Sequence, residues 1–191
     1  MSEHYIQDET FERMDYTSLA LAKGEYDNCT FINCNFAEQN LSGFKFIDCS
    51  FKHCNLSLVL LEKTALRDIL FEDCKMIGIR YENCLDFGLA FSFKRCQLQH
   101  SSFYGLNLKK IVFNECSLQE IDFSESDLSQ STFKDCDLLR ASFYHTNLEK
   151  ADLRSAYNYS IDPENNKLKK ARFSVSGIAG LLDKYNLQIE H

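Results

Sequence analysis

From Phe93 to Leu153 the chain places a large apolar residue at every fifth position, without one polar interruption. The run comprises Phe93, Leu98, Phe103, Leu108, Phe113, Leu118, Phe123, Leu128, Phe133, Leu138, Phe143, Leu148 and Leu153. A helix repeats its buried face about every 3.6 residues and a strand every two, so neither element produces this spacing. A fixed period of this kind indicates a repeat architecture, in which each repeat is one structural unit.

Two positions before each of these residues stands a small or apolar residue, and the other three positions of each five are mostly polar. Examples are Cys54-Asn55-Leu56, Cys136-Asp137-Leu138 and Ala151-Asp152-Leu153. This unit resembles that of the pentapeptide-repeat family over roughly residues 25–156. The resemblance implies an all-β fold, a right-handed quadrilateral parallel β-helix in which four pentapeptides complete one coil.

A four-sided coil requires like residues to recur every twenty positions, which the sequence itself can test. The spacing holds on both sides of an irregular stretch, residues 85–90, if two extra residues bulge outward near 86–88. The series that results is Phe31, Phe51, Phe71, Phe93, Phe113 and Phe133. We therefore expect one continuous rod of about six coils over residues 25–156, and not two domains.

The two ends of the chain lack the regular repeat. We expect residues 1–24 to form an N-terminal cap and residues 157–191 a C-terminal segment that caps the rod and mediates dimerisation. Solenoids need such ends because the last coil otherwise exposes its core and its unpaired strand edges. Within the C-terminal segment a short helix is predicted from about Val175 to Lys184, with Ser174 as a candidate N-cap.

All the cysteines occupy the small inward position of a repeat. They are Cys29, Cys34, Cys49, Cys54, Cys74, Cys84, Cys96, Cys116 and Cys136. We interpret them as buried free thiols that pack as small apolar residues. A metal site is the alternative, but the recurring spacing is C-x4-C and no histidine recurs beside it. Stacked coils could bring two thiols within disulfide range, although parallel side chains and a reducing compartment argue against a bond.

Composition excludes several classes of function. The formal net charge is −7, and no apolar run reaches the length of a membrane span. The N-terminus has no signal-peptide layout, so we expect a cytoplasmic protein. The histidines are isolated, and no phosphate-binding glycine loop or nucleophile motif is present. We therefore expect neither enzymatic activity nor a cofactor or metal.

Proteins of this family that resemble the quinolone-resistance (Qnr-type) and microcin-immunity members bind DNA gyrase and topoisomerase IV. They protect these enzymes from quinolones or peptide toxins, and the proposed mechanism is mimicry of duplex DNA by an acidic rod. The resemblance here includes the tail that begins Tyr159-Ser160-Ile161-Asp162-Pro163. It implies a type II topoisomerase as partner, with no direct contact to nucleic acid and no membrane.

The acidic stretch between Ile111 and Asp137 is the candidate surface for that partner. The candidate residues are Glu115, Glu120, Asp122, Glu125, Asp127 and Asp135. Asp122 and Asp127 stand directly before the large apolar residue of their repeat, which we call the central residue. Asn or Asp at this position commonly forms a hydrogen bond with the local backbone. The alternative interpretation of these two residues is therefore a structural role. For the glutamates the alternative is an ordinary solvated face.

The predicted C-terminal helix carries an apolar stripe larger than one coil end requires. Its residues are Val175, Ile178, Leu181, Leu182 and Tyr185. Related Qnr-type proteins dimerise through segments that follow the repeats, so this stripe is expected to pair with a second copy about a two-fold axis. A scaffold for an unrelated protein remains the alternative function. A hexapeptide-repeat acyltransferase is excluded, because its repeat is six residues long.

Overall fold

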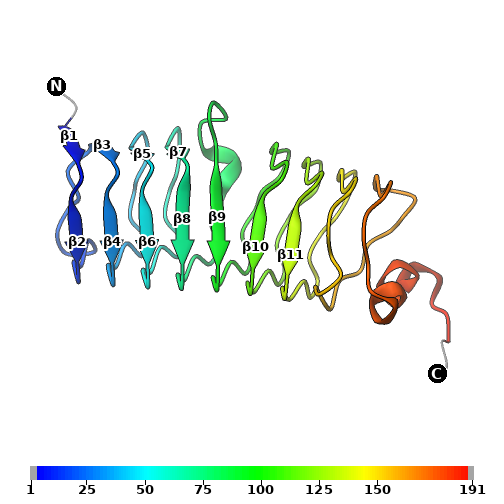
Figure 1. Cartoon of the computed structure of the whole chain (residues 1–191). Coiled ribbons are helices and arrows are strands. Elements are labelled where there is room, and N and C mark those ends of the chain that lie inside the picture. The colour runs from blue at the N-terminus through cyan, green and yellow to red at the C-terminus, as the bar shows by residue number, and fades with distance from the viewer. Residues whose placement is uncertain (1–3, 189–191) are drawn as a thin grey trace.

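The computed structural model describes residues 4–188, which form a rod with the two ends of the chain at opposite tips (Figure 1). The strands lie side by side along the rod, each roughly perpendicular to its length, and every pairing between them is parallel. Successive coils therefore stack on one another along the axis of the rod. This is the right-handed quadrilateral β-helix that the five-residue spacing predicts.

The longest sheet has seven strands, one from each of seven successive coils. They are β2 (Thr10–Glu12), β4 (Thr30–Ile32), β6 (Ser50–Lys52), β8 (Ile69–Glu72), β9 (Phe91–Lys94), β10 (Val112–Asn114) and β11 (Thr132–Lys134). Paired residues are twenty positions apart in most of the sheet, for example Phe31 with Phe51 and Phe113 with Phe133. The register places every central phenylalanine over the next.

A second, four-stranded sheet forms an adjoining side of the rod. It contains β1 (His4–Gln7), β3 (Gly24–Asp27), β5 (Lys45–Ile47) and β7 (Ala65–Arg67). The remaining sides are held by single parallel bridges, such as Asn35 with Asn55 and Ser102 with Asp122. These sides have too few consecutive pairs to count as strands, yet they keep the same spacing of twenty.

The corners of the coil explain how a short unit turns so sharply. In most repeats the residue two positions after the large apolar residue has a positive φ, as at Glu115 (55°), Glu120 (54°) and Lys150 (60°). Such a backbone is uncommon for residues other than glycine. Here it is stabilised because the corner N–H donates to a carbonyl of the next coil, at 2.7 Å from Glu115 to Lys134 and 3.0 Å from Lys150 to Lys169.

Stacked aromatic rings fill the interior. In the column that runs from Phe11 to Phe133, neighbouring ring centroids are 4.7 to 5.4 Å apart and nearly parallel. A second column begins at Tyr81 and continues through Phe103 and Phe123, with centroids 4.3 and 5.5 Å apart. Rings of the two columns meet edge to face, as Phe113 and Phe123 do. Both arrangements are favourable for aromatic pairs.

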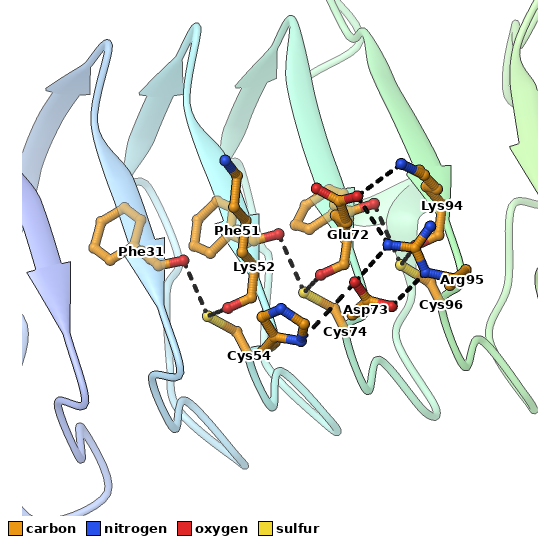
Figure 2. Close-up of polar contacts among 12 residues, drawn as sticks. Phe31, Phe51, Lys52, Cys54, Glu72, Asp73, Cys74, Lys94, Arg95 and Cys96 are labelled. Atoms are coloured by element: carbon orange, nitrogen blue, oxygen red, sulfur yellow. Dashed lines mark hydrogen bonds and ion pairs between the residues drawn. The ribbon is translucent and has the colours of Figure 1, made fainter.

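The small inward position places thiol and hydroxyl donors beside backbone carbonyls, some of which also accept a backbone hydrogen bond. Cys54 Sγ lies 3.4 Å from the carbonyl oxygen of Phe31 in the preceding coil and 3.3 Å from that of Lys52 (Figure 2). Thr64 Oγ1 donates in the same way to Leu41, at 2.8 Å. All the cysteines are buried and free, as predicted. In these repeats the position holds a small side chain with a weak or strong donor, whereas Val59, Ile111 and Ala151 occupy it in others.

The irregular stretch interrupts one side of the rod and leaves the adjoining side intact. A short 3-10 helix, η1 (Tyr81–Asn83), precedes a loop in which Phe87 is 81% exposed and lies against the Arg67 guanidinium, 5.2 Å from the ring centroid. The loop replaces the strand that would follow β7, which is why the four-stranded sheet ends there. Beyond it Phe71 pairs with Phe93 in register, so two extra residues are absorbed.

Both ends differ from the expected boundaries. Residues 4–24 do not form a separate cap, because β1 pairs with β3 and β2 with β4, which makes them a coil of the rod. At the other end the coil continues past residue 156, since Lys167 bridges Asn147 and Arg172 bridges Asp152. The rod is therefore longer than the predicted six coils.

The C-terminal helix is present but is not one α-helix. It consists of two 3-10 segments, η2 (Val175–Leu181) and η3 (Asp183–Tyr185). Ser174 caps η2 as predicted, since its side chain accepts a hydrogen bond from the Gly177 N–H at 3.1 Å. The segment covers part of the last coil (Figure 1), where the Gly180 carbonyl accepts a hydrogen bond from Ile161 at 2.9 Å.

Candidate partner-binding surfaces

Four of the six acidic candidates stand at corners of the coil. Glu115, Glu120, Glu125 and Asp135 all have a positive φ and all are exposed. Glu115, Glu120 and Glu125 occupy three successive corners of one lap, while Asp135 stacks one coil beyond Glu115. The corner geometry projects these side chains away from the axis. The repeat thus distributes acidic groups around the rod and does not gather them on one side.

Asp122 and Asp127 have a structural role instead. The Asp122 carboxylate accepts a hydrogen bond from the Ser124 N–H at 2.9 Å, and Asp127 accepts one from the Ser129 N–H at 2.9 Å. Asp127 also accepts from the Asn147 side chain at 3.0 Å. Both side chains are half-buried. These contacts are the local backbone bonds that the alternative interpretation of the sequence described, and they leave less of each carboxylate free for a partner.

The corner glutamates differ in how far their charge is compensated. Glu120 lies between His100 and Arg140, at 3.3 and 3.4 Å, in the coils before and after it. Glu125 accepts a hydrogen bond from Tyr104, which raises the pKa of that phenol. Glu115 has no ion pair within residues 4–188, and its stacked neighbour is another acid, Asp135. The Glu115 corner therefore carries two stacked acids without an ion pair in the described residues, as the corner of Asp48 and Asp68 also does.

An ion-pair ladder that the sequence did not reveal crosses the middle of the seven-stranded sheet (Figure 2). Lys94 and Arg95 both contact Glu72, at 2.8 and 2.9 Å, and Arg95 also binds Asp73 at 2.6 Å. His53 lies 3.9 Å from Asp73. The pKa of Glu72 is lowered by its hydrogen bond from Lys94, the larger effect, and by that from Arg95. The pKa of Asp73 is lowered mainly by its hydrogen bond from Arg95. This region of the rod is consequently close to neutral.

The apolar stripe of the C-terminal segment divides into two groups. Val175, Ile178 and Tyr185 are 88%, 46% and 51% exposed. Leu181 and Leu182 are half-buried, and Leu181 packs against the core of the last coil. Capping thus uses only part of the stripe. The exposed part extends to Leu187, which is 58% exposed.

Polar contacts hold that segment against the rod. Lys184 Nζ lies 2.6 Å from Asp162 and 2.7 Å from Glu164, and the Tyr185 hydroxyl donates to Glu164 at 2.9 Å. A surface cavity of about 450 Å³ remains between the last coil and η2, lined in part by Tyr157. The segment is thus held to the rod at Lys184 and Tyr185, and the cavity lies beside Ser174, Ser176 and Gly177.

Side chains that could bind a metal ion do not cluster within residues 4–188. No group of three or more His, Cys, Asp or Glu side chains in this part of the chain could hold a metal ion. The same residues include no helix that is long and apolar enough to cross a membrane. The surfaces described above are therefore the candidates for function in the described structure.

The fold defines a class of protein: a four-sided parallel β-helix whose sides are pentapeptides. The chain belongs to the pentapeptide-repeat family, because residues 25–103 and 110–181 match the family described as pentapeptide repeat region. No curated protein sequence matches the chain.

Several solved structures are similar to the chain at low sequence identity. QnrB1, a plasmid-mediated fluoroquinolone resistance protein, is 18% identical in its trypsin-treated form, with 98% of each chain covered and a TM-score of 0.49. The full-length form of QnrB1 is also 18% identical, with 97% of this chain and 100% of that chain covered and a TM-score of 0.46. HetL, a pentapeptide repeat protein involved in heterocyst differentiation regulation in the cyanobacterium Nostoc, is 12% identical, with coverages of 90% and 88% and a TM-score of 0.37.

Proposed function

We propose that this rod binds a type II DNA topoisomerase, DNA gyrase or topoisomerase IV, in place of DNA and shields it from a quinolone or a peptide toxin. The observation that carries the proposal is the set of exposed acids at three corners of one coil, Glu115, Glu120 and Glu125, with Asp135 stacked on the first. A rigid rod that presents carboxylates at regular intervals resembles the charge pattern of the DNA backbone. A DNA-binding groove of the enzyme could therefore bind it.

The extent of mimicry is limited by the total charge. Duplex DNA carries one negative charge per about 1.7 Å of its axis, far more than a rod with a formal net charge of −7 over its whole length. Contacts to the enzyme must therefore involve a local acidic region and not the full rod. The Glu115 corner fits this requirement, because its acids have no ion pair within residues 4–188.

The protein is further proposed to act as a homodimer in the cytoplasm. Val175, Ile178 and Tyr185 together with Leu187 leave an apolar surface at one tip of the rod. Pairing this surface about a two-fold axis would bury it and would double the length of the rod. Buried free thiols at every cysteine suit a reducing compartment.

A scaffold function for an unrelated protein is the second candidate. It is favoured by Phe87, which is 81% exposed in the loop, and by Leu58 and Leu60, which are 52% and 54% exposed. Exposed aromatic rings such as that of Phe87 are enriched at protein interfaces. Phe87 is separate from the acidic corners, because the loop lies on the side of the four-stranded sheet, whereas Leu58 stands in the same corner column as Glu120, three coils away.

A supercoiling assay with purified gyrase separates the two functions. The protein at micromolar concentration should alter gyrase activity or restore it in the presence of ciprofloxacin or a microcin. Changing Glu115, Glu120 and Glu125 to lysine should abolish the effect, and the fold should tolerate the change because lysine occupies the equivalent corner position, also with a positive φ, on another side of the coil at Lys110 and Lys150. The matched control changes three other corner acids, Glu38, Asp48 and Asp68, to lysine.

The outcomes are distinct. Loss of activity in the first variant only would support the acidic corners as the topoisomerase surface. No effect of the unmodified protein on gyrase or topoisomerase IV, with or without drug or toxin, would remove the proposal. Equal loss in both variants would show that total charge matters and the Glu115 corner does not.

A further inference from the structure

One side of the rod carries a set of lysines that the sequence scatters over sixty residues. Beyond the loop, the side that continues the four-stranded sheet contains Asn107, Asp127, Asn147 and Lys167, which are joined by successive parallel bridges. Six lysines lie at the outward positions of this side and at the corner that follows it. We call them the basic ridge. It consists of Lys109, Lys110, Lys150, Lys167, Lys169 and Lys170.

The alignment of the ridge follows from the coil. Lys110, Gln130, Lys150 and Lys170 occupy one corner in four successive coils, and each has a positive φ between 60° and 67°. Lys150 N–H donates to the carbonyl of Lys169, which fixes the last coil against the one before it. Coils rise by about 4.8 Å each, so the ridge is a straight row about 15 Å long.

The six lysines are exposed, and none makes an ion pair within residues 4–188. Elsewhere on the rod some basic residues pair with acids, as Lys45 does with Glu25 and Lys94 with Glu72, whereas Lys52 and Lys134 are single lysines without an ion pair within residues 4–188. Only two acids share this stretch of the side, Asp127 and Glu149. The ridge is therefore a local positive field on a chain whose formal net charge is −7.

The composition of the ridge distinguishes between classes of partner. Protein interfaces are rich in aromatic residues and poor in lysine, whereas nucleic-acid interfaces are polar and strongly positive. None of the exposed large apolar side chains of residues 4–188 lies at an outward position of this stretch. The ridge also lacks arginine, which commonly reads guanine, and aromatic rings on which single-stranded bases stack. These features favour contact with phosphates alone.

The end of the ridge beside the loop is concave. A groove of about 190 Å³ lies between the loop and the next coil, and Lys109 and Lys110 line it together with Asn107 and Leu89. Two lysines and an asparagine beside one groove suit an anion of phosphate size. The remaining lysines continue from this point toward the C-terminal tip.

We propose that the basic ridge binds the phosphate backbone of duplex nucleic acid without sequence preference. This departs from the expectation that the protein makes no direct contact with nucleic acid. The acidic corners at Glu115, Glu120 and Glu125 are the three other corners of the coil, so they repel the same duplex and restrict contact to the ridge. The proposal does not depend on topoisomerase binding.

Fluorescence anisotropy with a labelled duplex of arbitrary sequence tests the ridge directly. We expect binding at low salt, with the logarithm of the affinity falling by about 3 per tenfold rise in salt, the value for three to four phosphate contacts. Changing Lys150, Lys169 and Lys170 to glutamate should weaken binding by at least about tenfold. Glutamate occupies equivalent corner positions on other sides of the coil at Glu115 and Glu120, and Glu149 stands one coil before Lys169 at the same outward position, so circular dichroism of the variant should remain unchanged.

The control changes Lys23, Lys63 and Lys75 to glutamate, which alters the total charge equally at exposed positions outside the ridge. Its affinity should stay within about twofold of the unmodified protein. Equal weakening in both variants, or no binding at low salt, would overturn the proposal. So would tighter binding of labelled polyglutamate than of the duplex, because that result would assign the ridge to an acidic protein.

Discussion

The rings of Phe71 and Phe93 stack 12° from parallel with their centroids 5.3 Å apart, although twenty-two residues separate them and an irregular loop lies between. The same column continues at similar spacing on both sides of this pair. The loop is therefore an insertion on one side of a continuous rod. Surface positions on both sides of the loop consequently belong to common columns, which is the basis of the predictions that follow.

Removing a ring from the column should strongly destabilise the rod. Phe113 is fully buried between Phe93 and Phe133. Phe113→Ala is expected to lower the free energy of unfolding by about 3–5 kcal/mol, because it removes apolar burial and leaves a cavity. Ser117→Ala, at an outward position of the same coil, should change it by less than about 0.5 kcal/mol. Urea denaturation gives both values, and similar effects for the two variants would contradict the stacked core.

The cysteines should be unreactive in the folded protein. All are buried, and burial raises the pKa of Cys49 and of Cys84 to about 12. Because the thiolate is the reactive form, iodoacetamide at about pH 8 should leave the native chain unmodified. In guanidinium chloride it should label all 9 cysteines. Intact-mass spectrometry distinguishes the two states, and rapid labelling of the native chain would show that the small inward positions are open to solvent.

The ion-pair ladder predicts a pH dependence with a definite sign. Glu72 and Asp73 have pKa values below 4.5 and 3.8 respectively, their ordinary values. A carboxyl group with a lowered folded pKa stabilises the fold above its unfolded pKa, and the contribution is lost as pH falls through the folded pKa. Arg95→Gln should therefore lower stability at neutral pH, and its difference from the unmodified protein should shrink in acid.

Chemical denaturation at a series of pH values measures that difference. Lys75→Gln is the matched control, because Lys75 is exposed and has no ion pair within residues 4–188. Its effect should be small and independent of pH. A difference for Arg95→Gln that grows toward acid would have the wrong sign for the ladder.

The C-terminal segment should depend on a glycine. A Cβ atom at Gly180 would stand 2.1 Å from the carbonyl oxygen of Tyr159, a backbone atom that cannot move aside cheaply. Gly180→Ala is therefore expected to detach η2 from the last coil, which hydrogen exchange would record as lost protection at the Ile161 amide. Ala179→Ser, at the exposed neighbouring position, should preserve protection. Retained protection in Gly180→Ala would mean that the segment packs differently.

Much of the fold could be predicted because the repeat places the core directly in the sequence. The spacing of five gave the columns, and the spacing of twenty gave the number of sides. The first coil was missed because Glu9 and Met14 stand at positions where other repeats have a small residue. The last coil was missed because residues 157–166 interrupt the pattern before Leu168 and Phe173 resume it.

The surface was harder to predict than the core. Asp122 and Asp127 could be recognised as structural from their place in the unit, and the structure shows their backbone bonds. The partners of Glu120 could not be foreseen, because only stacking brings Arg140 and His100 beside it. The basic ridge could not be foreseen for the same reason. Its lysines are spread along the sequence and alternate there with acids that lie on other corners of the coil.

The stacking of Phe71 on Phe93 is the relationship on which every column depends, and a double-mutant cycle measures it most directly. Phe71→Leu, Phe93→Leu and the double variant should show a coupling free energy of about 0.5–1.5 kcal/mol, as expected for a pair of packed rings. Phe31→Leu and Phe133→Leu alter the same column in coils that are far apart. Their effects on the free energy of unfolding should be additive within about 0.5 kcal/mol. Additive effects of Phe71 and Phe93 would contradict a continuous rod, and with it the surfaces proposed for its partners.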